Sequence, residues 1–269
     1  MMKLDSASNR ELRKIGLQLY TVRDLLTVDF EETLKRVAIL GYSEVEFAGI
    51  FGSDVSRTRK LLSRLGLTAP SLHLDYATLT DNAQASFEIA HLLGSRFVIC
   101  PWLHPSVRKT TDDWKRICDN LNTIGQLASR SDLTLAYHNH DFEFADLPGR
   151  IQPYDLLLRR TDERLVKFEL DVYWAAKGNL DSARVLRSHP SRFPLVHLKG
   201  MANDGSTTEL GRGTIDFAGI LEAASVSDVE HVFVEQNVST DPLRSIETSI
   251  AFLRNQPHLS HGSIRPRTP

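Results

Sequence analysis

The stretch LTLAYHNHDFEFADLPGR, residues 133–150, joins a short apolar run to a dense cluster of polar side chains. Residues 133–137 have the length and composition of a buried strand. The groups that follow bind protons or metal ions: His138, Asn139, His140, Asp141 and Glu143. A buried strand that ends in histidines and carboxylates is the pattern expected where a barrel strand reaches a functional site.

The same alternation of strand and helix runs along the rest of the chain. Residues 29–41 are one example of the helical part, because Asp29 can cap a helix, Phe30, Leu34 and Val37 follow at helical spacing, and Gly41 can end it. Residues 21–27, in contrast, are predicted to be a loop. Besides the opening stretch, the expected strands are 14–20, 42–49, 67–76, 95–102, 164–174, 193–200 and 230–237, and the expected helices are 29–41, 53–66, 85–94, 111–130, 154–160, 180–190, 214–225 and 241–255.

Eight strand–helix repeats without a Pro/Gly-rich linker favour a single closed barrel. The strands are short and mostly apolar throughout, as in parallel sheets covered on both faces. A length of 269 residues suits one (β/α)8 TIM barrel better than an open doubly wound sheet. We therefore expect an α/β fold with a polar arm over residues 1–12, the barrel over 13–255, and a frayed tail over 256–269.

Composition excludes several classes of function. The chain is 41% hydrophobic and 25% charged, with a formal net charge of −2, so bulk charge draws it neither to nucleic acid nor to an anionic membrane. Cys100 and Cys118 fit no metal or redox spacing, which favours a reducing cytoplasm. We see no signal peptide, no bilayer-spanning run and no nucleotide-binding glycine loop.

Polar residues gather at the carboxyl ends of the expected strands, where the sites of such barrels lie. Asp171, His197 and Glu235 come from three successive strands and should converge on one mouth. Carboxylates with an imidazole suit Mn²⁺, Mg²⁺, Co²⁺, Fe²⁺ or Zn²⁺. The alternative is a set of unrelated rim residues and surface ion pairs. The other residues at these ends include Gln18, Tyr20, Glu46, His73, Asp75, Trp102, His104, Glu169, Lys199 and Asn237.

Residues 14–254 resemble the sugar phosphate isomerase/epimerase family, the xylose isomerase-like TIM barrels. The resemblance rests on an ordered set of motifs: IGLQLYTVRD, GYSEVEFAG, YHNHDFEF, ELDVYWAAKGN, VHLKGM, ELGRGTIDFAGIL and FVEQ followed by DPLRSIETSIAFL. It implies one divalent metal ion held by a strand-five glutamate, a strand-six aspartate, a strand-seven histidine and a strand-eight glutamate. By position, the last three fall on Asp171, His197 and Glu235.

The chain departs from the family pattern at several positions. His138 stands where family epimerases have the strand-five glutamate, so the fourth ligand is His138, Glu143 or neither. Gly200 replaces the aspartate of an HxKD pattern, which would loosen the surroundings of His197. Arg212 stands where relatives often carry an acidic residue, and is either a substrate contact or plain surface.

The resemblance implies a metal-dependent isomerase or epimerase of a sugar or keto-sugar that works through an enediolate. The expected acid–base residues are Glu235 with Glu143 or His138, and Lys199 would stabilise the oxyanion. A lyase or hydratase acting on a 3-keto-sugar or glycoside uses the same proton abstraction and remains an alternative. So does a non-catalytic sugar-binding barrel, whereas a DNA-repair endonuclease of this fold disagrees with the acidic balance. The expected substrate contacts are Glu46, His73, Trp102, His140 and Arg212; Trp174 is equally compatible with a core position, and homo-oligomerisation is left open.

Overall fold

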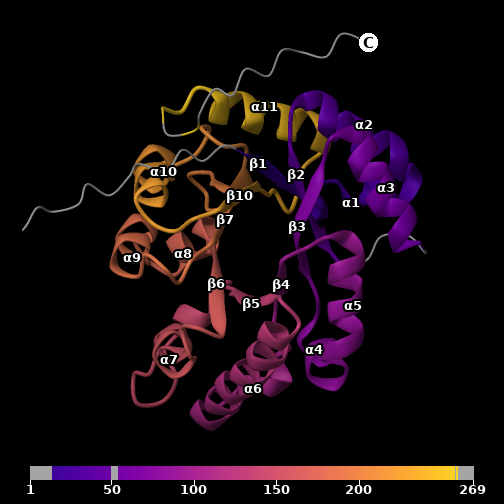
Figure 1. The fold of residues 1–269 in the computed structure, drawn as a ribbon. Coiled ribbons are helices and arrows are strands. Elements are labelled where there is room, and N and C mark those ends of the chain that lie inside the picture. The colour runs from indigo at the N-terminus through magenta and orange to yellow at the C-terminus, as the bar shows by residue number, and fades with distance from the viewer. Residues whose placement is uncertain (1–13, 50–53, 258, 260–269) are drawn as a thin grey trace, which may run out of the picture.

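The computed structural model describes residues 14–49, 54–257 and 259, and eight parallel strands close into a barrel. The hydrogen-bonded order around the barrel is β1-β10-β7-β6-β5-β4-β3-β2, and helices surround the strands (Figure 1). The prediction of a single (β/α)8 barrel is confirmed. The barrel strands are β1 (Ile15–Gln18), β2 (Glu44–Ala48), β3 (Thr68–His73), β4 (Phe97–Cys100), β5 (Thr134–His138), β6 (Val166–Asp171), β7 (Leu195–Leu198) and β10 (His231–Val234).

The helices begin and end at the residue types that the sequence places there. Asp29 accepts a hydrogen bond from the backbone N–H of Glu32 at the start of α2, and Gly41 ends that helix with a left-handed φ of 96°. The helices are α1 (Arg23–Val28), α2 (Phe30–Leu40), α3 (Val55–Leu65), α4 (Tyr76–Asp81), α5 (Ala83–Leu93), α6 (Thr111–Arg130), α7 (Pro153–Arg160), α8 (Val172–Lys177), α9 (Ser182–Ser188), α10 (Phe217–Ser225) and α11 (Pro242–Arg254), with 3-10 turns η1 (Leu19–Val22), η2 (Pro105–Val107) and η3 (Phe142–Phe144).

Several segments differ from the expectation. The helix α4 (Tyr76–Asp81) is not predicted, and it begins at the residue where the expected third strand ends. Residues 21–27 are largely helical, in η1 and α1, rather than a loop. Residues 172–174 begin α8 instead of continuing the sixth strand, because the side chain of Asp171 accepts the backbone N–H groups of Tyr173 and Trp174. After β7 the chain forms a small antiparallel hairpin of β8 (Gly200–Met201) and β9 (Thr207–Thr208).

The inside of the barrel is filled in layers by every second residue of each strand. A small apolar cluster of Phe97, Ile99, Ala136, Leu195 and Phe233 occupies one part of this interior. Gly16 leaves room for the ring of Phe233, which would lie 2.2 Å from an added Cβ. Two residues further along β7 and β5, the same inward face carries His197 and His138. These two histidines therefore lie directly next to the apolar cluster in the barrel interior.

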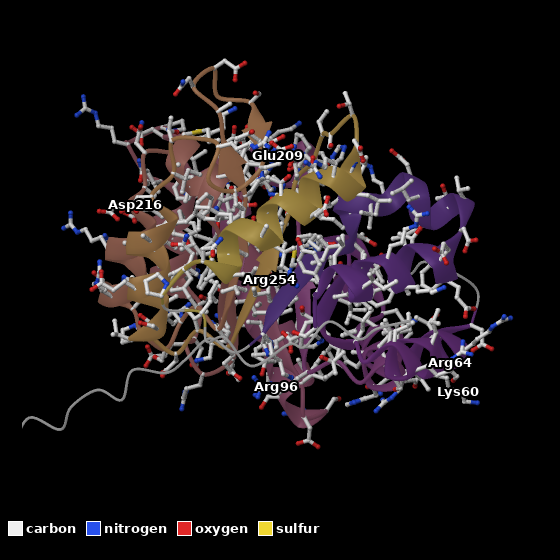
Figure 2. All side chains as sticks on the ribbon, turned by 90° about the horizontal axis from the view of Figure 1, so that it is seen from above. Lys60, Arg64, Arg96, Glu209, Asp216 and Arg254 are labelled. Carbon is white, nitrogen blue, oxygen red and sulfur yellow. The ribbon has the colours of Figure 1, made fainter. Side chains whose placement is uncertain are left out.

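The two ends of the barrel carry different side chains. Figure 2 shows Glu209, from the segment after β9, and Arg96, at the start of β4, at opposite ends of the molecule. The sequence predicts that polar residues gather at the carboxyl ends of the strands, and it indicates no comparable cluster at the amino-terminal end of the barrel. The structure nevertheless buries one glutamate there, Glu44, whose carboxylate lies 2.7 Å from His231 Nδ1 and 3.3 Å from Lys14 Nζ.

The predicted domain limits stay largely untested. The arm over residues 1–12 lies outside the described residues, as does most of the tail. Leu259 is described, and it is buried in the core rather than frayed. None of the helices in the described ranges combines the length and apolar character needed to cross a bilayer.

Candidate metal centre and active site

Buried histidines and carboxylates converge at the carboxyl ends of the barrel strands in two overlapping groups. The ligand atoms within each group all lie within 4.8 Å of one another. Both groups contain His138 and His197. We call His138, Asp171, His197 and Glu235 the outer group, and His73, His138, Glu169 and His197 the inner group.

The outer group brings together residues from β5, β6, β7 and the end of β10. Adjacent strands set its geometry, since Asp171 is the register partner of His197. Nδ1 of His197 lies 2.8 Å from Oε2 of Glu235, and Nε2 of His138 lies 3.8 Å from Oδ2 of Asp171. The three residues that the sequence places on one mouth, Asp171, His197 and Glu235, are thus assembled as expected, with His138 as the fourth.

The inner group lies deeper and uses the opposite nitrogen of each shared ring. Nδ1 of His138 lies 2.9 Å from Oε2 of Glu169, and Nε2 of His197 lies 3.2 Å from the same oxygen. Nε2 of His73 is 2.8 Å from it as well. Glu46 is next to this group, with Oε2 2.6 Å from Nε2 of His197. Three imidazoles therefore converge on one carboxylate oxygen.

The charges in this cluster offset one another. Burial by itself lowers the pKa of His197, but the neighbouring carboxylates Glu169 and Glu46 outweigh it, so the pKa is raised. Burial raises the pKa of Glu169, but His197 and His73 outweigh it, so the pKa lies well below the usual value. Unpaired, these carboxylates would be costly to bury; together with the histidines they form a charged, hydrogen-bonded layer across the barrel.

Lys199 adds a fixed ammonium group to the outer group. Its Nζ lies 2.8 Å from Oδ2 of Asp171 and 3.1 Å from Oε2 of Glu235, and its side chain is buried. Burial lowers the pKa of Lys199, but these two carboxylates outweigh it and raise the pKa. The amine is therefore held in its charged form beside the ligand oxygens.

The residues of the outer group fit a divalent metal ion. Their donors are imidazole nitrogens and carboxylate oxygens, the set that Mn²⁺, Fe²⁺, Co²⁺ and Zn²⁺ accept. Oδ2 of Asp171 is buried and, despite its contact with Lys199, has no well-oriented hydrogen bond within the described part of the chain. A buried carboxylate oxygen in that state is suited to a cation.

Glu143 lies outside both groups. Its Oε1 accepts a hydrogen bond of 2.6 Å from the Tyr137 hydroxyl, and its Oε2 accepts one of 2.9 Å from the backbone N–H of His140. The carboxyl is completely buried, and burial raises its pKa to about 7. The geometry thus favours His138 over Glu143 as the strand-five ligand, and it gives Glu143 a role in shaping the loop after β5.

The expected substrate contacts fall into two sets. Glu46 and His73 are buried within the inner layer, where other protein groups bond their side chains. His140 is near the outer group, with its ring centroid 5.2 Å from that of His138 and 5.3 Å from that of Trp174. Burial lowers the pKa of His140 to about 2, and its Nδ1 is buried without a hydrogen-bond partner among the described residues. Trp102, which follows β4, is 43% exposed.

Arg212 is exposed, in the segment between β9 and α10. No described side chain forms a salt bridge with it within 4.0 Å, so its predicted substrate contact stays a prediction.

The structure explains why residue 200 is a glycine. A Cβ there would lie 2.4 Å from the carbonyl oxygen of Thr208, so the β8–β9 hairpin leaves no room for the aspartate of the HxKD pattern.

No role is predicted from the sequence for Glu169, although it contacts three histidines. Glu169 lies two residues before Asp171 and so points to the same inward face of β6. That spacing is the signal that could have identified it. Gln18 and Ser71 show the same inward pattern, and both donate hydrogen bonds to Glu46.

The fold and the site together agree with one family of barrel enzymes. Residues 34–256 match the family model of the xylose isomerase-like TIM barrel, and the chain belongs to this family. The chain is 23% identical over 245 residues to an inosose dehydratase of Geobacillus thermodenitrificans, covering 77% of this chain and 81% of that protein.

Two solved structures share the fold. A sugar phosphate isomerase/epimerase from Parabacteroides distasonis has a TM-score of 0.82 at 24% identity, over 92% of this chain and 100% of the other. The IolI protein with a bound zinc atom has a TM-score of 0.73 at 13% identity, over 90% of this chain and 97% of the other. The proteins to which this chain is similar thus include both a dehydratase and an isomerase or epimerase.

Proposed function

We propose that the protein is a divalent-metal-dependent lyase that removes water, or another β-substituent, from a keto-sugar or a related polyhydroxylated ketone. The metal would be held by His138, Asp171, His197 and Glu235. When bound there, it would supply Lewis-acid chemistry that polarises the substrate's keto group and makes the neighbouring C–H bond more acidic. The sequence predicts this proton abstraction for an epimerase, and the same abstraction begins an elimination.

The observation that favours elimination is that strand five provides no carboxylate, and that Glu143 after it is not free to act as a second acid–base group. Epimerisation by paired acid and base needs a second group across the substrate from Glu235. His138 replaces one expected glutamate, and Glu143 is buried and bonded to Tyr137 and the backbone of His140. The described carboxylates thus offer Glu235 no free partner on strand five.

An elimination needs one acid–base group. In this proposal Glu235 takes the α-proton, the C–H electrons form a C=C bond, and the β C–O bond breaks. The same carboxyl group then returns the proton to the leaving hydroxyl, so that the overall loss is one water molecule. Its Oε1 makes no hydrogen bond within the described ranges, whereas Oε2 is engaged by His197 and Lys199.

Other residues would bind the substrate. The Lys199 ammonium, beside Asp171 and Glu235, would stabilise negative charge on the substrate oxygen. Trp102 offers an exposed ring for the apolar face of a sugar. The unpartnered Nδ1 of His140 would bind a hydroxyl group.

The family relatives support this choice in part. The inosose dehydratase is named for a dehydration, and the Parabacteroides structure for isomerisation or epimerisation. Epimerisation is the second candidate, and it requires an imidazole, His138 or His140, to act where family epimerases use glutamate.

The experiment is to incubate Mn²⁺- or Co²⁺-loaded protein with inosose and with 3-keto-glucosides in D₂O and to follow the products by NMR and mass spectrometry. A lyase gives a product that has lost the β-substituent, and Glu235→Gln abolishes both this loss and any exchange of the α-proton. Formation of the deuterated epimer of the substrate, with no product that has lost the β-substituent, would reject the lyase in favour of an epimerase. Tight substrate binding with neither exchange nor loss would indicate a non-catalytic barrel.

A further inference from the structure

We propose that Glu169 and Glu46 are positioning residues, which hold the rings of His138 and His197 so that their opposite nitrogens face the outer group. This inference rests on the metal centre of the proposed function, but not on which reaction that centre performs. It assigns Glu46 and the inner group to orienting the two ligand histidines, and not to binding a second metal ion.

Glu169 orients His138. Its Oε2 lies 2.9 Å from Nδ1 of His138, close enough to accept a hydrogen bond from that nitrogen. With the proton on Nδ1, the lone pair of the ring is on Nε2, the nitrogen that faces Asp171. Strand register brings this about, because His138 and Glu169 are partners across β5 and β6.

Glu46 does the same for His197 from the other side of the barrel. Its Oε2 lies 2.6 Å from Nε2 of His197, close enough to accept a hydrogen bond from that nitrogen. When a metal ion displaces the second ring proton, the proton on Nε2 is kept by Glu46 and the lone pair is on Nδ1, the nitrogen 2.8 Å from Glu235. Glu46 is itself held in place: the amide of Gln18 donates to Oε2 at 2.7 Å, and the hydroxyl of Ser71 donates to Oε1.

His73 ties the two carboxylates together. Its Nε2 lies 2.9 Å from Oε2 of Glu46 and 2.8 Å from Oε2 of Glu169, so a proton there is shared between them. The ring of His73 stacks against that of His197, with 5.5 Å between centroids and 12° between planes. The carboxylates and rings thus limit one another's rotation.

A second metal ion in the inner group is the rival interpretation. It would need Nδ1 of His138 and Nε2 of His197, the nitrogens that face Glu169 and Glu46. Occupying both groups at once would therefore require each ring to bind metal through both nitrogens, as a fully deprotonated imidazolate. Hydrogen bonds from neutral rings to carboxylates need no such deprotonation, so one metal ion is expected per chain.

The physical effect of such partners is known in outline. A carboxylate behind a ligating histidine fixes its tautomer and increases its basicity, and loss of that partner typically weakens metal binding by roughly 10–100-fold. Glutamine in place of glutamate keeps a carbonyl acceptor of similar size but removes the charge. We expect Glu169→Gln and Glu46→Gln to weaken binding by about this factor, with the stoichiometry unchanged.

Glu44→Gln is the matched control. Glu44 lies on the same strand as Glu46, two residues earlier, and is equally buried, but its contacts are Lys14 and His231 at the other end of the barrel. It therefore reports the effect of neutralising a buried glutamate in β2 without touching the two ligand histidines.

The test measures Zn²⁺ and Co²⁺ stoichiometry and affinity by chelator competition for the full-length wild type and the three variants. In addition, ¹⁵N-histidine NMR of the zinc-loaded wild type reads the tautomers directly, which keeps the inference testable if a variant fails to fold. The expected result is one metal per chain, Nε2 ligation for His138, Nδ1 ligation for His197, and weaker binding in Glu169→Gln and Glu46→Gln only.

Two metal ions per chain, the reverse tautomers, or equal affinity in Glu169→Gln, Glu46→Gln and Glu44→Gln would each overturn the inference. So would a wild-type protein that binds neither metal. Metal binding as expected but without elimination on any substrate would reject only the proposed lyase activity, because none of these readouts depends on turnover.

Discussion

Nζ of Lys199 lies 2.8 Å from Oδ2 of Asp171, while Oδ1 of the same carboxylate accepts the backbone N–H groups of Tyr173 and Trp174. One aspartate thus starts helix α8 with one oxygen and faces the outer group with the other. Local helix capping holds the carboxylate at a fixed angle, so the oxygen that faces the outer group is oriented by the fold itself.

Replacing Asp171 with asparagine separates these two roles. The amide oxygen can still accept the N–H groups of Tyr173 and Trp174, but the negative charge toward Lys199 is gone. We expect the chain to fold while its metal affinity falls by more than the roughly 10–100-fold typical of an indirect partner. Metal analysis by mass spectrometry after dialysis, with circular dichroism for folding, measures both effects.

Asp181→Asn is the control for that substitution. Asp181 caps α9 by accepting the N–H of Arg184, and it is exposed. Its neutralisation should leave the metal content unchanged. Retention of a full metal complement by Asp171→Asn would remove Asp171 from the ligand set.

Glu143 should make the stability of the fold depend on pH. Burial raises its folded pKa from 4.5 to about 7, so the folded state stays protonated where the unfolded chain is already ionised. The contribution of Glu143 to stability is therefore greatest below about pH 4.5, falls as the pH rises toward 7, and then levels off. At about 1.4 kcal/mol per pKa unit, the decrease is at most about 3.5 kcal/mol.

Glu143→Gln isolates this contribution from that of the histidines. Urea unfolding at pH 5, 6, 7 and 8 should show the free energy of unfolding of the wild type falling relative to that of the variant as the pH rises. A constant difference between the two proteins across this range would mean that Glu143 titrates normally in the fold.

Gly200→Ala tests the close contact between β8 and β9. The new Cβ would lie 2.4 Å from the carbonyl oxygen of Thr208, a backbone atom that cannot move aside freely. We expect a loss of about 1–3 kcal/mol in the free energy of unfolding, measured in urea. Asn203→Ala, at an exposed position of the same hairpin, should change it by no more than about 0.5 kcal/mol. Equal stability of both variants would show that the hairpin moves to make room.

The two cysteines should be unreactive in the native protein. Both are free and buried, and burial raises the pKa of each thiol to about 12. Because the thiolate is the reactive form, a disulfide reagent at pH 8 should label neither Cys100 nor Cys118 until urea unfolds the chain. Rapid labelling of native protein would indicate that α6 or the end of β4 opens readily.

Much of the fold was predictable because its signals are local. Apolar runs of strand length, an aspartate such as Asp29 before a helix and a glycine such as Gly41 after it are readable without tertiary contacts. The start of α8 was missed because Val172, Tyr173 and Trp174 have strand-like side chains, while the cap of Asp171 that begins the helix is a single side-chain contact.

The sequence by itself determined the barrel and the mouth at which Asp171, His197 and Glu235 meet, since strand direction and alternation follow from the residue pattern. Only the tertiary structure decided that His138 joins them, that Glu143 turns instead to Tyr137, and that Glu169 gathers three histidines. Alternation places a side chain inside the barrel, but its depth depends on the stagger of neighbouring strands. That stagger arises only when all eight strands close.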